Sequence, residues 1–222
     1  MSEYTSLIYP EVENDYPSKL CGYIYDRFFS EYDGSLLDIG CSKGTHFHEF
    51  EKQGLQCWGV DLRKDIDNDR CKTCNIEMER FPFDDNMFQA VWSKSVIEHI
   101  TSPDHMLNEA QRLLQPNGII VLMTPDWESQ MSHFWDDYTH VKAWTQKSLM
   151  NCLKMFGFRN VGCEKIYQLP FTWAYPQLSF IPKIVSFCPQ SWKWKDKTMT
   201  NGKDRKLIRF SKEKMLLAWG YK

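Results

Sequence analysis

Two histidines and two aspartates lie within eight residues of one another, shortly after an apolar run that reads as a buried strand. The run is 119–124, and the cluster contains His133, Asp136, Asp137 and His140. A neutral imidazole can remove a proton from a hydroxyl group, and a carboxylate can do the same or assist it. We therefore expect a general base in this segment, with His140 as first candidate and His133, Asp136 or Asp137 in its place.

The same cluster has two other interpretations. Histidine and aspartate are metal ligands, so the segment could hold a divalent cation that binds a vicinal diol. Its polar groups could also hydrogen-bond one another in a purely structural loop. We favour the base over both alternatives and assign no residue as a metal ligand.

A glycine turn and a later carboxylate together predict a nucleoside pocket. The apolar run 36–39 enters a turn with Gly40 and Gly44, and Asp61 closes the next apolar run. Glycines let backbone N–H groups approach a ligand closely, and an acidic residue about 20 positions later can accept hydrogen bonds from ribose hydroxyls. The fingerprint of NAD-binding proteins fails, because Ser42 occupies its second glycine position.

An ordered series of segments resembles the class I S-adenosylmethionine (SAM) dependent methyltransferases. Their first motif runs acidic-x-Gly-x-Gly-x-Gly, and here it has Asp38, Gly40, Ser42 and Gly44. The resemblance covers roughly 36–124 and continues through Asp61 and then through 81–91, 97–100 and 109–118. An ordered series of this kind is far more specific than a lone glycine motif.

The resemblance implies an α/β, Rossmann-like fold, with a seven-stranded and mostly parallel sheet, an antiparallel last strand and helices on both faces. Apolar runs that alternate with helical patterns agree with that fold. We expect a single methyltransferase domain over 1–222. Its parts would be an N-terminal helical cover 1–33, a cofactor-binding core 34–168, an aromatic and basic insertion 169–206 and the last strand 207–222.

The resemblance also implies where SAM would bind. It assigns Gly40 and Gly44 to close approach to the methionine and ribose portions, Asp38 to the amino-acid end and Asp61 to the ribose hydroxyls. The adjoining residues predicted to complete this part of the site are Cys41, Ser42, Leu62 and Ser93.

Asn75 stands where many members of that family carry an aspartate for the adenine. Its side-chain carbonyl can still accept a hydrogen bond from the adenine amino group. Ile76 could pack on the ring. We therefore expect adenine recognition with a weaker charge contribution.

Aromatic side chains near the histidine cluster predict an acceptor with a ring face to stack on. We expect a SAM-dependent O-methyltransferase for a hydroxyl of a sugar or glycan, because this segment loosely resembles enzymes of surface-glycan assembly. A phenolic, quinone or lipid-like acceptor is the alternative, and a SAM-binding pseudoenzyme or partner subunit is the second. The predicted acceptor contacts are Trp127, Trp135, Tyr138, Trp173 and His99, although His99 could equally orient a loop.

The charge is unevenly distributed along the chain. Net charge is −2, yet from Lys183 onward eleven Lys and Arg residues face three Asp and Glu. Such a tail, with Trp192 and Trp194 between its lysines, could touch an anionic partner or a membrane surface. Nucleic acid is not favoured as a substrate, because Ser93-Lys94-Ser95-Val96 replaces the Asn-Pro-Pro-Tyr type motif of amino-methylating DNA enzymes.

The remaining signals concern compartment and cysteines. No apolar run reaches the roughly 20 residues of a membrane-spanning helix, and the polar start lacks the features of a signal peptide. We therefore expect a cytoplasmic protein. Of the eight cysteines only Cys71 and Cys74 have ligand spacing, so reduced structural thiols are favoured over zinc or disulfides.

Overall fold

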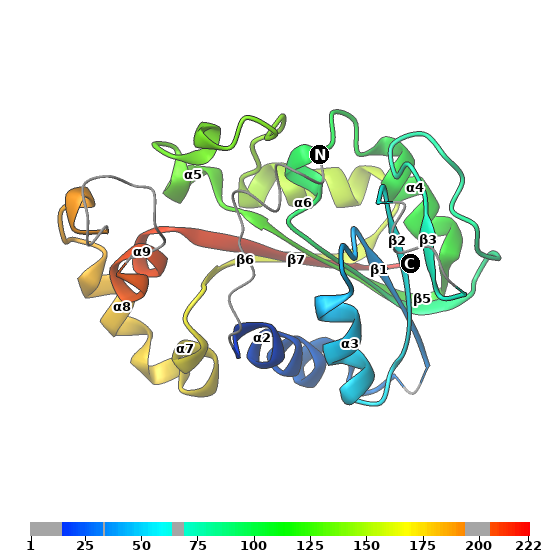
Figure 1. Cartoon of the computed structure of the whole chain (residues 1–222), viewed down its shortest axis with the longest axis horizontal. Coiled ribbons are helices and arrows are strands. Elements are labelled where there is room, and N and C mark those ends of the chain that lie inside the picture. The colour runs from blue at the N-terminus through cyan, green and yellow to red at the C-terminus, as the bar shows by residue number, and fades with distance from the viewer. Residues whose placement is uncertain (1–14, 33, 64–68, 194–204) are drawn as a thin grey trace.

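One sheet divides the molecule into two helical layers (Figure 1). The computed structural model describes residues 15–32, 34–63, 69–193 and 205–222. Within these residues seven strands lie in the order β3-β2-β1-β4-β5-β7-β6. The strands are β1 Ser35–Ile39, β2 Gln56–Asp61, β3 Cys71–Thr73, β4 Phe88–Lys94, β5 Leu114–Pro125, β6 Arg159–Tyr167 and β7 Lys214–Tyr221.

The sheet has the topology predicted from the sequence. Strands β1 to β5 pair in parallel, whereas β7 pairs antiparallel with both β5 and β6. Because β1 to β5 run the same way, their carboxyl ends meet at one edge, and the order reverses between β1 and β4. Ligands of open parallel sheets bind at such a reversal. The predicted fold class is confirmed.

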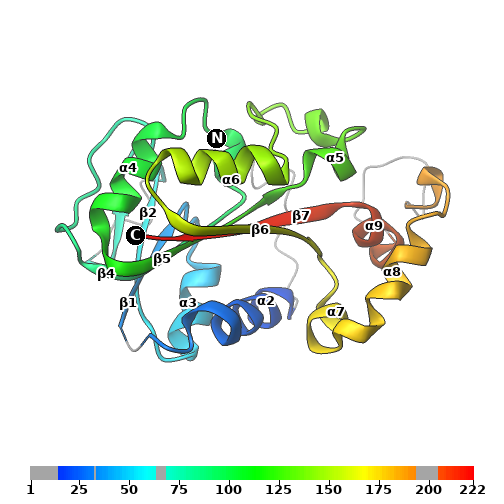
Figure 2. The same cartoon turned by 180° about the vertical axis from the view of Figure 1, so that it is seen from behind.

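Helices cover both faces of the sheet (Figure 2). Leu20, Ile24 and Phe50 belong to the apolar cluster on one face, and Leu107 and Leu149 to the cluster on the other. The α-helices are α2 Tyr16–Ile24, α3 Thr45–Lys52, α4 Asp104–Leu113, α5 Trp127–Gln130, α6 Gln146–Met155, α7 Pro170–Ala174, α8 Phe180–Val185 and α9 Lys206–Lys212. The described residues also contain one π-helical and four 3₁₀ segments, of which η1 Tyr25–Phe29, η3 Ile97–His99 and η4 Phe134–Asp136 bear on the site.

Local signals set the beginnings of two helices near the site. α3 begins after Gly44, whose φ of 80° is a left-handed conformation that glycine adopts without strain. α6 begins at a capping box, in which Thr145 accepts from the backbone N–H of Ser148 and the Ser148 side chain accepts in return. A glycine and a capping threonine therefore fix where α3 and α6 begin.

The structure differs from the sequence-based assignment at two places. Residues 115–118, whose Gln-Pro-Asn-Gly sequence is typical of a turn, lie inside β5, where Asn117 has a φ of 65° and the pairing with β4 shifts register between Phe88 and Ala90. Residues 207–212, predicted as part of the last strand, form most of α9 instead. Much of the predicted basic tail, 194–204, lies outside the described residues.

The insertion after β6 contains short helices that extend away from the sheet. In Figure 1 α7, α8 and α9 follow one another at the end of the molecule where β6 ends and β7 begins. We call the described part of this insertion, residues 169–193 and 205–212, the arm. In the part of the chain that the structure describes, no helix is both long and apolar enough to cross a membrane.

Candidate functional site

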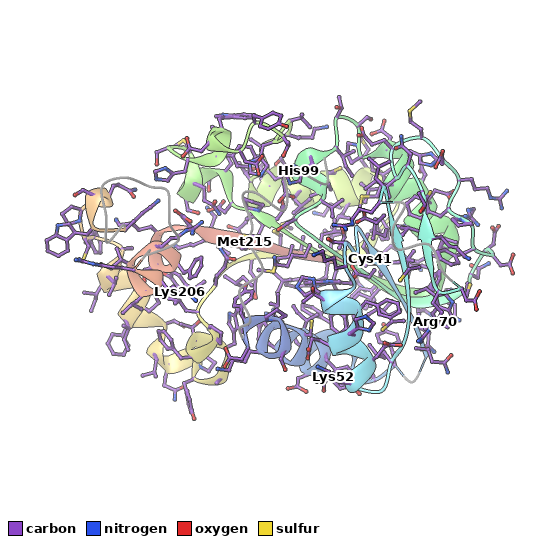
Figure 3. The ribbon with its side chains drawn as sticks, viewed as in Figure 1. Cys41, Lys52, Arg70, His99, Lys206 and Met215 are labelled. Atoms are coloured by element: carbon purple, nitrogen blue, oxygen red, sulfur yellow. The ribbon has the colours of Figure 1, made fainter. Side chains whose placement is uncertain are left out.

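The glycine loop is fixed to the neighbouring strand at the carboxyl edge of the sheet. Backbone N–H groups of Gly40 and Cys41 donate to the Val60 carbonyl, at 2.8 and 3.3 Å. Gly40 and Gly44 both have positive φ, of 78° and 80°. The loop therefore turns sharply between β1 and α3, and its predicted close approach to a ligand stays a prediction. Figure 3 labels Cys41 in this loop.

Asp61, at the end of β2, holds the glycine loop through its carboxylate. Oδ2 accepts from the Ser42 backbone N–H at 2.8 Å, and Oδ1 accepts from the Arg63 N–H at 3.0 Å. Each oxygen retains a lone pair, and the residue is partly exposed. Leu62, beside it, is half exposed. The carboxylate can thus accept from ribose hydroxyls while it keeps the loop in place.

Asp38 is a buried carboxylate with an unsatisfied oxygen. The residue is 2% exposed, and its Oδ2 has no hydrogen-bond partner among the described residues. Burial, and then the charge of Asp61, raise the pKa of Asp38 to about 8. An ammonium group would satisfy that oxygen and favour the charged carboxylate. The amino-acid end of SAM carries such a group, so this residue fits the predicted cofactor.

The other predicted cofactor contacts lie after β3 and in β4. Asn75 Oδ1 accepts from the Glu77 N–H at 3.1 Å, in a local turn, and Ile76 packs against the core. Ser93 is buried, and its hydroxyl donates to the Ile39 carbonyl at 2.8 Å, which joins β4 to β1. Ser93 thereby fixes the end of β1, where the glycine loop begins.

Lys94 is a candidate site residue that the sequence-based assignment missed. It ends β4 at the edge where the other candidates lie, and it is only partly exposed. Burial lowers its pKa, and the charge of Glu98, with smaller contributions from Cys21 and Asp38, opposes that shift. A lysine that directly follows the apolar run 88–93 was the available signal, because lysine is rarely buried unless its charge has a partner.

Glu98 brings two distant loops together. Its carbonyl accepts from the backbone N–H groups of Val141 and Lys142, at 2.9 and 3.1 Å. Its side chain is buried, and Oε2 accepts from the Thr124 hydroxyl at 2.8 Å. Burial raises the pKa of Glu98, and the backbone, Thr124 and His140 act against that shift.

His99 and His140 meet beside Glu98. Their ring centroids are 4.8 Å apart, although the residues are separated by 41 positions in the sequence. His140 Nδ1 lies 2.6 Å from the Phe134 carbonyl, and Nε2 lies 4.0 Å from Asp137 Oδ2. A carbonyl can only accept, so Nδ1 carries a proton, and in the neutral ring Nε2 keeps the lone pair. The predicted base thus has the tautomer that proton removal requires. Figure 3 labels His99 in this region.

The remaining residues of the predicted histidine and aspartate cluster lie further out. His133 Nδ1 is 3.4 Å from Asp136 Oδ2, and Asp136 is exposed. Asp137 Oδ1 accepts from the Thr139 hydroxyl at 2.6 Å, so it orients the turn that carries His140. His140 therefore lies beside Glu98 with Asp137 next to it, whereas His133 and Asp136 form a second pair.

Three of the predicted aromatic contacts lie in or beside the loop that carries His140, and the fourth, Trp173, lies in the arm. Trp127 and Trp135 both pack edge to face against Phe134, and Trp135 and Tyr138 are largely exposed. Trp173, in α7, stacks on Tyr23 of α2 at 5.3 Å, and its indole N–H donates to the Tyr167 carbonyl. Trp173 thus fixes the arm to the helical cover, and an acceptor role for it stays a prediction.

A hollow of about 330 Å³ lies at the glycine loop. It is bounded by the loop, by α3 and by the start of β3, and Glu98, His99 and His140 do not line it. Its lining residues are Ser42, Lys43, Gly44, Phe47, His48, Arg70 and Cys71.

Comparison with known proteins gives several partial matches. A ubiquinone biosynthesis O-methyltransferase of Rhodopseudomonas palustris is 29% identical over 107 residues, 42% of this chain and 42% of that protein. The sterol 4-C-methyltransferase strm-1 of Caenorhabditis elegans is 25% identical over 122 residues, 48% of this chain and 36% of that protein. The matches thus span between about a third and two fifths of these curated relatives.

A solved structure and a family model extend the comparison to most of the chain. A SAM dependent methyltransferase from Archaeoglobus fulgidus superposes with a TM-score of 0.62 at 18% identity, over 93% of this chain and 94% of that one, which shows a shared fold. The model of the methyltransferase domain matches residues 13–162. The predicted family and its cofactor, SAM, are therefore confirmed. None of the relatives reported above is named for a sugar acceptor, so that acceptor stays a prediction. The chain belongs to the methyltransferase domain family.

Proposed function

We propose that this chain is a SAM-dependent O-methyltransferase that acts on a hydroxyl group of a ring-shaped small molecule. The observation that carries the proposal is the position of His140, whose Nδ1 faces the Phe134 carbonyl and whose ring lies with Glu98 and His99 at the carboxyl edge. The residues that suit the cofactor lie at the same edge, at the ends of β1 and β2. Cofactor and base would thus face one space.

SAM supplies a methyl group on a positively charged sulfur. Asp38 would bind its ammonium group, and Asp61 would accept hydrogen bonds from its ribose. Lys94, at the end of β4, suits the carboxylate of the same amino-acid end. These contacts would hold SAM so that its methyl carbon faces the acceptor oxygen along the axis of the breaking carbon–sulfur bond.

His140 would take the proton from the acceptor hydroxyl at Nε2. The Phe134 carbonyl holds the ring in position, and Asp137 at 4.0 Å would stabilise the imidazolium that forms. A base of this kind contributes roughly 10²–10⁴-fold in rate. The oxygen would attack the methyl carbon as the carbon–sulfur bond breaks.

A sugar or glycan is our first acceptor class. Exposed rings of Trp135 and Tyr138 lie on the loop that carries His140, and such rings stack on pyranose faces while polar groups bind the hydroxyls. Asp136, exposed on the same loop, is suited to bind such a hydroxyl.

The arm favours a second acceptor class, a quinone, phenol or lipid-like molecule. Phe187 is 85% exposed, and Phe180, Ile184 and Trp192 are more than half exposed, with Lys183 among them. Exposed apolar groups with a cation suit contact with a membrane surface, where such acceptors dissolve. The ubiquinone and sterol methyltransferases among the relatives agree with this class.

Two experiments in sequence test the proposal. Calorimetric titration with SAM and its demethylated product should show binding, and a methyl-transfer assay should then compare glycosides with catechols and hydroquinones, with and without anionic vesicles. Product from glycosides supports the first class, and vesicle-dependent product from hydroquinones supports the second. No SAM binding would overturn the proposal, and binding without turnover on either panel would favour a SAM-binding partner subunit.

A variant series tests the base. His140→Ala should lose 10²–10⁴-fold in turnover while SAM affinity is retained. His105→Ala is the matched control, because His105 is also a histidine held by a backbone carbonyl, that of Glu79, but lies outside the cluster. Full activity in His140→Ala would exclude its role as base.

A further inference from the structure

Three side chains from two loops present ligand atoms to one point. Glu98 and His99 follow β4, and His140 belongs to the loop before α6. One ligand atom from each residue lies within 4.8 Å of the other two. The grouping exists because Glu98 fixes the His140 loop through the backbone bonds to Val141 and Lys142.

Both histidines are oriented as metal ligands usually are. His140 Nδ1 donates to the Phe134 carbonyl at 2.6 Å. His99 Nδ1 lies 3.2 Å from the Thr139 carbonyl and 3.0 Å from the Thr139 hydroxyl. Because Nδ1 of each ring carries the proton, Nε2 of each ring has its lone pair available. Metal-binding histidines typically donate their second N–H to a carbonyl or carboxylate in this way.

Glu98 completes the set with a buried carboxyl group. It is 1% exposed, and Thr124 occupies only one of its carboxylate oxygens. Within the described residues no lysine or arginine nitrogen is recorded within 4 Å of that carboxylate, and Lys94 acts on it only at longer range. A buried carboxylate without a close cation is costly, and a bound metal ion would offset that cost.

The distances and ligand types indicate the class of ion. Nitrogen ligands at about 2.0–2.1 Å in a tetrahedral site lie roughly 3.3 Å from each other, so the farthest pair here must approach by at most about 1.5 Å. Side-chain rotation can supply that. Two imidazoles and one carboxylate suit Zn²⁺ or Co²⁺, whereas Mg²⁺ and Ca²⁺ prefer oxygen ligands.

We propose that Glu98, His99 and His140 bind a divalent transition-metal ion of the Zn²⁺ type and leave one coordination position open for the acceptor. The proposal rests on the proposed function for what the ion does, but not for whether it binds. An acceptor hydroxyl in the open position would lose its proton more readily, as zinc-bound water does. The proton would pass to Asp137 or to water, the oxygen would attack the methyl carbon, and the carbon–sulfur bond would break.

In this proposal the positive charge of the ion, instead of the histidine base, activates the acceptor hydroxyl. With metal bound, His140 Nε2 is a ligand and cannot take a proton, so activation would come from the ion. In the metal-free chain the same Nε2 is the base described above. A metal site was not assigned from the sequence, because its ligands lie in two segments and Glu98 had no predicted role.

The test measures metal binding without any acceptor. Chelator-treated full chain is titrated with Co²⁺, with detection of its visible absorption, and with Zn²⁺ by calorimetry. We expect one ion per chain with nitrogen and oxygen ligation, and at least 100-fold weaker binding in His140→Ala and His99→Ala. Glu98→Gln, which keeps the side-chain shape, should weaken binding at least tenfold.

Control variants distinguish metal binding at this site from binding by other side chains, and loss of the site from misfolding. His105→Ala and His133→Ala should bind the ion as the unmodified chain does, and SAM affinity should be retained in every variant. Equal binding in the chain and in the double variant His99→Ala/His140→Ala, or a spectrum of thiolate ligation, would overturn the proposal. Full methyl transfer without metal binding would overturn it and leave the proposed function standing. Metal binding without transfer to any acceptor would do the reverse.

Discussion

The backbone N–H of Ser42 donates to the carboxylate of Asp61 at 2.8 Å. This bond joins the two segments expected to contact the cofactor, which are the glycine loop after β1 and the end of β2. Ser42, at the central position of the glycine motif, has a φ of 48°, and its backbone N–H is held by the carboxylate. Cofactor affinity should therefore depend on Asp61 twice, through the ribose and through the shape of the loop.

Replacing Asp61 should test that double dependence. We expect Asp61→Ala to weaken SAM binding roughly 10–100-fold, because hydrogen bonds to a charged acceptor contribute about 1.5–3 kcal/mol. Asp61→Asn should lose less, since its amide oxygen can still accept one N–H. Calorimetry measures both, with the exposed Asp84→Ala as control. Equal affinity in all three variants would contradict the assigned role.

Asp38 should release a proton when SAM binds. Its raised pKa of about 8 keeps it largely protonated at pH 7, and a bound ammonium group would lower that pKa. The heat of SAM binding should therefore vary with the ionisation enthalpy of the buffer, in the direction of proton release. Asp38→Asn should show no such dependence, and a proton uptake in the unmodified chain would contradict the assignment.

The same shift gives a pH dependence of stability without ligand. Asp38 has a higher pKa folded, about 8, than unfolded, about 3.9, so the folded state holds the proton more tightly. Its contribution is complete below pH ~4 and is lost as pH rises to about 8. Urea unfolding of the ligand-free chain between pH 5 and 8 should show this fall, and Asp38→Asn should remove it.

Gly59 should be intolerant of a side chain because of Cys41. A Cβ at position 59 would lie 2.6 Å from Cys41 Sγ and 3.0 Å from its Cβ. Gly59→Ala should destabilise the fold by about 1–3 kcal/mol and weaken SAM binding, because the glycine loop must move. Adding Cys41→Ala should restore part of both losses. Gly22→Ala, with open space around it, is the control, and a harmless Gly59→Ala would show that the loop yields freely.

Lys193 should stabilise the arm rather than serve a basic surface. Its ammonium is buried and paired with Glu213, which also accepts from Arg209 Nε at 2.7 Å. Burial raises the pKa of Glu213, but Arg209 and Lys193 outweigh it, and the net pKa is lowered. Lys193→Met should therefore cost about 3 kcal/mol in urea unfolding, and the exposed Lys183→Met much less.

The pH dependence of that loss distinguishes the ion pair from packing. A lowered folded pKa gives stability that is present above the unfolded pKa and lost as pH falls through the folded one. The difference between Lys193→Met and the unmodified chain should thus shrink below pH ~4. A constant difference would indicate that only the packing of the side chain matters.

Local patterns were sufficient to predict the strands of the sheet. Buried runs such as 36–39 and the capping residue Thr145 act within a few positions, so the sequence displays them directly. The meeting of His99 with His140 is different, because it depends on the Glu98 carbonyl binding a loop some 40 residues away. Lys193 likewise resembles a surface lysine in the sequence, because only the folded chain shows that it is buried and paired with Glu213.

The position of β7 has a consequence for how the chain folds. In the described sheet β6 hydrogen-bonds only to β7, which is made about 50 residues later. During synthesis β6 must therefore wait without a partner, and the pairing closes a long loop that includes the whole arm. Such non-local pairing is slow and leaves a strand edge exposed to aggregation in the meantime. The arm can nevertheless vary in length at little entropic cost, because loop closure depends only weakly on loop length.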